Sequence, residues 1–354
     1  MKLGFGLYRH QLDDEYLRFA VQCGATHVVV HLVDYFSGGG EGSRGDQPVG
    51  VLEGEWGLAG NPDELWTQTL LDGIRDQLNA HGLVFHAIEN FDPAHWHDIL
   101  LDGPQREQHI ANVRTLIERA GRSGVKVIGY NFSLAGVYGR VKGPFGRGGA
   151  EVVGMEEVDT RPIRDGVLWN MQIPHLTGSA ARARVAADVL WDRHRRFLLD
   201  VLPAAEKAGV RLAAHPDDPP VDRLRDTPRL VNCPEYFLRL LEAADHPSNT
   251  LEFCLGTLME MPGDNHYQII EECARRGRIG YIHFRNVRGK APRYMETFID
   301  EGDLDMRRVV NILRRHHFDG VLIPDHAPGM SCPAPWHAGM AYTMGWMRNA
   351  LQSL

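Results

Sequence analysis

The sequence of 354 residues predicts one α/β domain, residues 1–354, folded as a TIM barrel of eight strand and helix units. Short apolar runs rich in β-branched and aromatic residues alternate along the chain with segments of helical periodicity. Strands separated by helices pair in parallel through crossover connections. Eight such units favour a closed barrel over an open sheet, because these barrels take about 250 residues and exceed 400 with insertions.

Each unit is an apolar run followed by an amphipathic segment. The predicted strands are Leu3–Tyr8, His27–Leu32, Val84–Glu89, Val125–Phe132, Val210–His215, Leu251–Gly256, Ile279–Asn286 and Gly320–His326. The predicted helices are Asp13–Cys23, Pro62–His81, Pro104–Arg122, Ala180–Lys207, Pro234–Asp245, Asn265–Arg276, Asp305–His316 and His337–Leu351. Several helices begin at a proline and several end at a glycine, the usual start and stop residues of helices.

Two long connections exceed what the barrel needs. They follow the second and fourth strands, as segments 37–60 and 133–178. The loops after barrel strands lie at the face that carries the active site, so we expect these two insertions to be lids over a small polar substrate. Decoration of the barrel without a role in catalysis is the alternative interpretation.

The composition excludes several classes of function. Apolar residues make up 43% and charged residues 24% of the chain, as in a soluble globular protein. Lys and Arg number 38 against 46 Asp and Glu, and the net charge of −8 argues against nucleic acid or an anionic membrane as a partner. The start of the chain has no signal-peptide core, and no apolar run is long enough for a membrane span, so we expect a cytoplasmic protein. The five cysteines form no C-x-x-C pair and indicate no disulfide framework.

Four of the last strands end on residues that bind metals. His215, Cys254, His283 and Asp325 lie in the last few residues of the fifth to eighth predicted strands. Because the strand ends of a barrel meet at one mouth, these side chains predict a metal site, with a soft ion such as zinc favoured by the thiolate. Each alone is more typical of a structural histidine or a core cysteine, but four in register on consecutive strands favour a metal.

A cation for an anionic substrate is predicted at Arg285. A divalent ion with these ligands forms a nearly neutral site, so an anionic substrate needs a further positive charge. Arg285 follows His283 by two residues, on the same side of its strand, and can bind a carboxylate with two hydrogen bonds. The alternative is that Arg285 only orients Asp217 or Asp218.

Three other strand ends carry polar residues. Tyr8, Glu89 and Asn131 end the first, third and fourth strands, and we expect them to bind substrate, with Glu89 holding a hydroxyl or acting as a second acid. Burial against neighbouring loops explains them about as well. His31 and His86 are expected to be structural, because their strands are buried on both faces.

Taken together, these segments resemble the mannonate dehydratases of hexuronate breakdown. The resemblance rests on KLGFGLYRHQLDDEYLRFAVQCGATHVV, HAIENF, VKVIGYNFS, LAAHPDDPP, LEFCLGTLMEM, IHFRNV, ETFIDEGDLDM and VLIPDH. It implies a TIM barrel that holds a divalent metal, usually manganese, and removes water from D-mannonate to give 2-keto-3-deoxy-D-gluconate. The implied metal ligands are the four strand-end residues above, with zinc, iron(II) or cobalt(II) as alternative ions, and the implied catalytic residues are His326 and Tyr342.

The reaction needs a base for the proton on carbon 2 and an acid for the hydroxyl that leaves carbon 3. His326 and Tyr342 are assigned to this pair, and the sequence does not divide the two roles between them. Two alternatives remain: a metal-dependent sugar isomerase or epimerase on the same barrel, which the thiolate ligand disfavours, and a non-catalytic protein that binds sugar acids or metals. The expected partner is a small sugar acid, and the oligomeric state, including a homo-oligomer, is left open.

Overall fold

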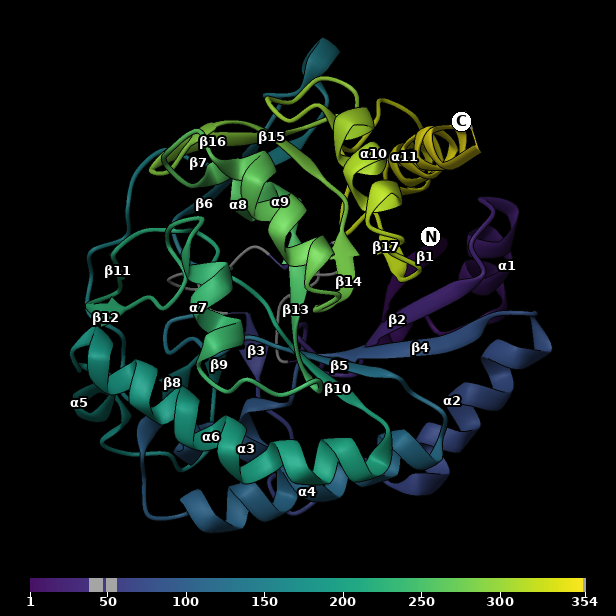
Figure 1. Ribbon diagram of the computed structural model, residues 1–354. Helices are drawn as coiled ribbons and strands as arrows, with labels where there is room; N and C mark the ends of the chain where they lie inside the picture. Colours follow the sequence, from purple (N-terminus) through teal and green to yellow (C-terminus); the bar gives the residue numbers. More distant parts are fainter. Residues whose placement is uncertain (38–46, 49–55, 353–354) are drawn as a thin grey trace.

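The computed structural model describes residues 1–37, 47–48 and 56–352. Eight parallel strands close into a barrel in the order β1, β17, β14, β13, β10, β5, β4, β2 (Figure 1), which confirms the predicted TIM barrel. Their bounds are Lys2–Tyr8 (β1), His27–His31 (β2), Val84–Glu89 (β4), Val127–Tyr130 (β5), Arg211–Ala214 (β10), Asn249–Cys254 (β13), Ile279–His283 (β14) and Val321–Ile323 (β17). Each corresponds to one predicted strand.

The eight predicted helices are all present, and one of them is divided. The helices are α1 (Asp14–Gln22), α2 (Gln68–Ala80), α4 (Arg106–Arg122), α5 (Ser179–Ala183), α6 (Ala187–Ala208), α7 (Tyr236–Glu242), α9 (His266–Arg275), α10 (Met306–Arg315) and α11 (Pro335–Gln352). The predicted helix Ala180–Lys207 is α5 and α6, and α2 begins later than predicted because the Thr67 side chain accepts a hydrogen bond from Leu70 N.

Two further α-helices, α3 (Pro93–Leu101) and α8 (Leu255–Glu260), are absent from the prediction. Every residue of α3 is buried, so its sequence lacks the amphipathic period on which the prediction depended. Short 3-10 helices cover Arg9–Gln11 (η1) and Arg147–Gly149 (η2).

Additional sheets lie outside the barrel. A four-stranded sheet has the order β15, β16, β7, β6, and its bounds are Asn286–Lys290, Arg293–Thr297, Val152–Met155 and Arg140–Gly143. It lies near the top of Figure 1. A three-stranded sheet joins β3 (Gly57–Leu58), β9 (Met171–Gln172) and β8 (Val167–Leu168), and β11 (Arg223–Leu224) pairs with β12 (Thr227–Pro228).

The predicted insertions differ in what the structure says of them. Segment 133–178 contains β6 to β9 and so pairs with strands from other parts of the chain, β16 and β3 among them. Segment 37–60 lies mostly outside the described residues, which include only Ser37, Gln47, Pro48 and residues 56–60 of it. The role of either insertion as a lid stays a prediction.

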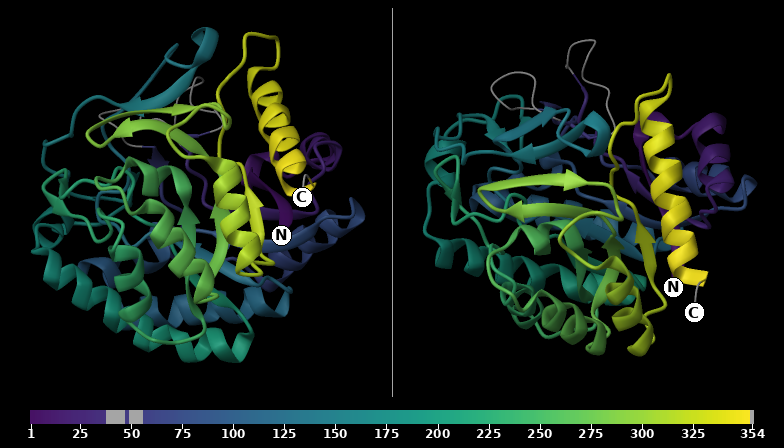
Figure 2. Two further views of the ribbon diagram at one scale, coloured as in Figure 1. Left: turned by 45° about the horizontal axis from the view of Figure 1, so that its top comes forward. Right: turned by 90° about the horizontal axis from the view of Figure 1, so that it is seen from above.

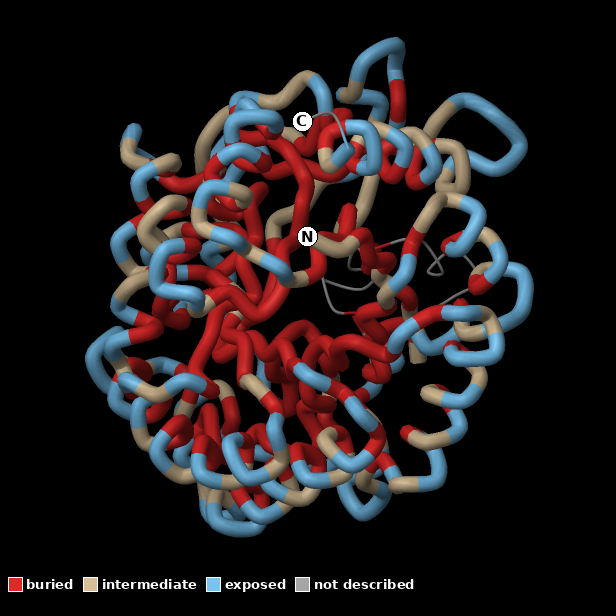
Figure 3. Tube along the Cα trace, turned by 45° about the vertical axis from the view of Figure 1, so that its right-hand side comes forward, coloured by how far each residue is buried: buried red, intermediate tan, exposed pale blue. Residues whose placement is uncertain are grey.

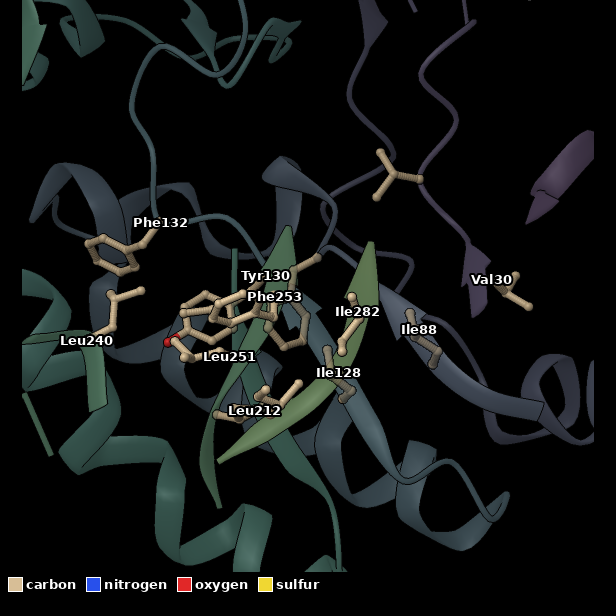
Figure 4. Close-up of a cluster of buried hydrophobic side chains, with 14 of the residues drawn as sticks. Val30, Ile88, Ile128, Tyr130, Phe132, Leu212, Leu240, Leu251, Phe253 and Ile282 are labelled. Atoms are coloured by element: carbon tan, nitrogen blue, oxygen red, sulfur yellow. The ribbon is translucent and has the colours of Figure 1, made fainter. Parts of the chain in front are cut away.

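Two buried layers hold the barrel together. One cluster, whose members alternate with outward-facing residues along the strands, fills its interior: Val29, Ala87, Val127, Ala213, Tyr281, Val321 and Ile323. The intervening residues, such as Val30, Ile88 and Ile282, belong to the larger core that includes the helices (Figure 4). The barrel strands are largely buried, while exposed residues gather on the outer surface (Figure 3).

The two ends of the chain meet where the barrel closes. Lys2 of β1 pairs with Val321 of β17, and the ring of Trp336 on α11 lies 5.9 Å from that of Phe5 and 5.4 Å from that of Tyr16. Helix α11 therefore runs beside the N-terminal segment (Figure 2). Among the described residues, none of the helices has the length and apolarity needed to cross a bilayer.

Candidate active site

Along each barrel strand every second side chain points into the barrel, and this alternation also places the polar residues at its mouth. The inward residues Val29, Ala87, Ala213, Tyr281 and Ile323 are followed two positions later by His31, Glu89, His215, His283 and Asp325. These five line one cavity, which His326, Asn131 and Tyr8 also line. The cavity therefore lies at the carboxyl end of the barrel strands, where enzymes of this fold keep their active sites.

The predicted metal ligands converge at this mouth. Donor atoms of His215, Cys254 and His283 all lie within 4.8 Å of one another. Asp325 Oδ2 lies 3.4 Å from His283 Nδ1, a buried atom without a hydrogen-bond partner among the described residues. His215 Nδ1 donates to the carbonyl of Pro216, which leaves its Nε2 as the ligand atom. A thiolate, two imidazoles and a carboxylate at these positions fit a divalent cation.

The predicted metal ligands include an ionised thiol, which attracts a cation. Burial opposes ionisation of Cys254, but Arg285 and the neighbouring imidazoles of His215 and His283 hold the pKa of its thiol well below the usual range. Burial also opposes protonation of His215, but the hydrogen bond to Cys254 and the nearby Glu252 raise the pKa of His215 to about 9. The Cys254 thiolate is thus paired with a protonated His215, and a cation bound by both side chains would take the place of that proton.

A carboxyl pair lies beside the metal ligands. His283 Nε2 is 3.1 Å from Glu89 Oε2 and 3.1 Å from Glu252 Oε1. Burial and the neighbouring Glu89 raise the pKa of Glu252 to about 8, whereas His31 and His283 outweigh burial and hold the pKa of Glu89 at about 2. One carboxyl of the pair therefore holds a proton at neutral pH while the other is ionised.

Two residues of the cavity were not among the predicted site residues. His31 lies 3.6 Å from Glu89 and lines the cavity, and its expected structural role stays a prediction. Glu252 was not predicted, although it precedes Cys254 by two residues and so shares its side of β13. This spacing of two residues was the feature of the sequence that could have predicted Glu252 as a site residue.

His326 is held from two sides. Its Nδ1 lies 3.0 Å from Glu296 Oε2 on β16, and its Nε2 lies 3.2 Å from Asp325 Oδ2. Burial is outweighed by these two carboxylates, which raise the pKa of His326. Asp325 has a φ of 64°, a left-handed conformation that aspartate tolerates, and this turn lets the consecutive residues Asp325 and His326 both line the cavity.

The structure does not bring Tyr342 to this cavity. Tyr342 lies on α11, where its hydroxyl donates to Asp300 Oδ2 at 2.8 Å and its ring meets that of Phe298 at 5.6 Å. Among the described residues, the tyrosines that line the cavity are Tyr8 and Tyr35. The catalytic role predicted for Tyr342 has no support in this geometry, because helix α11 directs the side chain to a different part of the fold.

Arg285 also differs from its prediction. Its guanidinium is buried against Asp218 (2.7 Å), Glu260 (2.8 Å) and Asp325 (3.0 Å), and it does not belong to the cavity lining. The interpretation as a substrate-carboxylate residue is corrected, since these carboxylates already occupy its donors. The contact with Asp218 agrees with the alternative that Arg285 orients an aspartate, whereas Asp217 pairs with Arg229 instead.

The remaining lining includes residues that were not among the predicted site residues, some of them in the two predicted insertions. Arg140 on β6 donates to Asp218 Oδ2 at 2.9 Å, and both residues line the cavity. Tyr35, Trp56 and Trp169 form an aromatic wall, with ring centroids 5.4 Å apart for each pair. None of these residues ends a barrel strand, so strand-end reasoning could not find them.

Comparison with known proteins gives a consistent result. The model of the D-mannonate dehydratase family matches residues 1–150 and 166–343. The mannonate dehydratase of Streptococcus equi subsp. zooepidemicus is 28% identical over 280 residues, covering 74% of this chain and 75% of that protein. Mannonate dehydratase 2 of Halalkalibacterium halodurans is 26% identical over 276 residues, covering 74% and 79%.

Solved structures show the same fold. The mannonate dehydratase from Streptococcus suis serotype 2 has a TM-score of 0.76 at 24% identity, covering 100% of this chain and 94% of that one. D-Psicose 3-epimerase from Clostridium cellulolyticum H10 has a TM-score of 0.55 at 12% identity, covering 99% of each chain. The isomerase and epimerase alternative thus corresponds to more distant relatives in fold. Because the family model matches most of the chain, this protein belongs to the D-mannonate dehydratase family of hydro-lyases.

Proposed function

We propose that this protein is a metal-dependent hydro-lyase that converts D-mannonate to 2-keto-3-deoxy-D-gluconate and water. The observation that carries the proposal is the convergence of His215, Cys254 and His283 with Asp325 and His326 at the mouth of a barrel of this family. We extend the proposal to a role in hexuronate breakdown, because D-mannonate is the substrate that the family resemblance implies. We also propose a cytoplasmic location, as expected from the sequence.

His215, Cys254, His283 and Asp325 would hold the cation, for which we propose manganese(II). Zinc, iron(II) and cobalt(II) are the alternatives, and the thiolate of Cys254 favours these softer ions. When bound, a divalent cation supplies Lewis-acid stabilisation of the negative charge that develops on the oxygens of the sugar acid.

The residues of the chain move the protons. The bond between carbon 2 and its hydrogen breaks as a base takes the proton, and the hydroxyl on carbon 3 accepts a proton and leaves as water. The resulting enol tautomerises to the 2-keto acid. His326 is one proton-transfer group, since it lines the cavity and is oriented by Glu296. Glu89 is the second, with Glu252 beside it, because both carboxyls line the same cavity.

Other lining residues suit a polyol chain. Asn131 offers a donor and an acceptor and Tyr8 a hydroxyl, and both line the cavity as the sequence had suggested. The aromatic wall of Tyr35, Trp56 and Trp169 supplies an apolar surface for the carbon-bound hydrogens of the substrate. We propose that these groups select the length and configuration of the sugar acid.

A turnover assay tests the proposal. Purified protein is incubated with manganese(II) and D-mannonate, and the expected product is a 2-keto-3-deoxy acid, absent when EDTA is added. His215→Ala should lose turnover, whereas the exposed Cys332→Ser should keep it. An isomerised sugar, or binding of D-mannonate without any product, would contradict the proposed dehydration and support one of the alternative functions.

A further inference from the structure

The cavity is rich in carboxylates. Glu89, Asp218, Glu252 and Asp325 line it, and among the described lining residues Arg140 is the only arginine or lysine. A sugar acid that enters this cavity meets the ionised carboxylates of Glu89 and Asp218, and this like charge costs binding energy at close range. A fixed positive group is therefore needed where the carboxylate of the ligand lies.

Arg140 has donors that other residues leave unused. Its Nη2 donates to Asp218 Oδ2 at 2.9 Å and its Nη1 to Gln47 Oε1 at 2.7 Å. A guanidinium has five N–H donors, so most of them have no hydrogen-bond partner among the described residues. Arg285 is the contrasting case, because Asp218, Glu260 and Asp325 surround it outside the cavity.

Asp218 fixes the position of Arg140. Its Oδ2 also accepts from Arg285 Nη2 at 2.7 Å, and its Oδ1 accepts from the hydroxyl of Tyr294 at 3.0 Å. Tyr294 on β16 and Arg285, which follows β14, therefore hold the carboxylate of Asp218 in place independently of Arg140. An arginine held in this way is already oriented and loses little side-chain entropy when a ligand binds.

We infer that Arg140 binds the carboxylate group of the sugar acid and thereby selects acids over neutral polyols. The inference rests on the proposed function and adds the residue that recognises the anionic end of its substrate. It also gives segment 133–178 a role, because β6 of this segment carries Arg140 to the cavity and β7 pairs it with β16.

Chemical rescue separates recognition of the carboxylate from support of the fold. In Arg140→Ala, the KM for D-mannonate should rise about 100-fold, the loss typical of truncating one partner of a buried charge pair. The affinity for manganese(II) should stay within about twofold, because Arg285 and Tyr294 still hold Asp218. Millimolar guanidinium should restore part of the lost kcat/KM, and the neutral analogue urea at the same concentration should not.

Two further variants complete the test. Arg140→Lys keeps the charge without the planar fork and should give an intermediate KM. Lys142→Gln, on the same strand but in an exposed ion pair with Glu151, should behave as the wild type. A wild-type KM in Arg140→Ala, or a loss that guanidinium does not rescue, overturns the inference. A wild type that does not convert D-mannonate overturns the proposed function, and with it the inference.

Discussion

Glu296 Oε2 lies 3.0 Å from Nδ1 of His326, and this contact joins the outer sheet to the mouth of the barrel. Because a carboxylate only accepts hydrogen bonds, Glu296 favours a proton on Nδ1 of the imidazole and fixes the orientation of the ring. The two residues come from different connections of the barrel, so the outer sheet is part of the site.

Removal of Glu296 should reduce turnover more than substrate binding. Glu296→Ala should lower kcat about 100-fold and leave KM within about threefold, because the imidazole loses the partner that orients it. Glu296→Gln keeps an acceptor oxygen and should lose less. Steady-state kinetics with D-mannonate measure both values. Glu301→Ala, which removes the partner of Arg147 instead, is the control, and an equal loss of kcat in that variant would contradict the positioning role.

Gly256 should tolerate no side chain. It follows Cys254 by two residues, and an added Cβ would collide with the guanidinium of Arg285. Gly256→Ala should lower the free energy of unfolding by about 1–3 kcal/mol, as overpacking does in buried sites, and should weaken manganese(II) binding because Arg285 contacts Asp325. Urea unfolding and metal titration measure the two effects.

The matched control for this substitution is Gly345→Ala in α11, where an added Cβ meets no atom within 4 Å. It should raise the free energy of unfolding by about 0.5–1 kcal/mol, since alanine favours a helix over glycine. An equal free energy of unfolding for Gly256→Ala and Gly345→Ala would contradict the close packing of Arg285 against Gly256.

Buried neutral histidines should make stability depend on pH. Burial lowers the pKa of His194 to about 3, and its Nε2 lies 2.9 Å from the Tyr130 hydroxyl. The folded state therefore binds fewer protons than the unfolded state below the ordinary histidine pKa of about 6.5. His194 stabilises the fold fully above that pH, and this contribution falls by about 1.4 kcal/mol per pH unit as the pH drops towards 3.

The change His194→Gln should remove this part of the pH dependence, although the variant is less stable at neutral pH. Urea unfolding at pH 7.5, 6.0 and 5.0 gives the difference between variant and wild type, which should shrink as the pH falls. His175→Asn, at an exposed position with a left-handed φ that asparagine tolerates, should run parallel to the wild type. A difference for His194→Gln that stays constant with pH would contradict the assignment.

Features that depend on a local period could be predicted from the sequence. Eight apolar runs separated by helical segments were sufficient to predict the barrel, and the closed topology then brought His215, Cys254 and His283 together. Asp325 and His326 were placed at the same mouth by the same rule.

Features that depend on pairing between distant segments could not be predicted. Tyr294 of β16 pairs with Met155 of β7, and no local pattern indicates that strands so far apart in sequence meet. This pairing places Arg140 in the cavity. The position of Tyr342 depends on where α11 packs. The position of the Arg285 side chain depends on the buried acidic residues around it. Both are properties of the tertiary structure, which a local sequence pattern does not indicate.

The central claim is that Cys254 and its neighbours share one cation, and cobalt(II) substitution tests it most directly. Bound to a thiolate, cobalt(II) has a sulfur-to-metal charge-transfer band in the near ultraviolet. The account predicts this band in the wild type and in Cys332→Ser, and its loss in Cys254→Ser. A band that persists in Cys254→Ser, or a wild type that binds cobalt(II) without one, would contradict the claim.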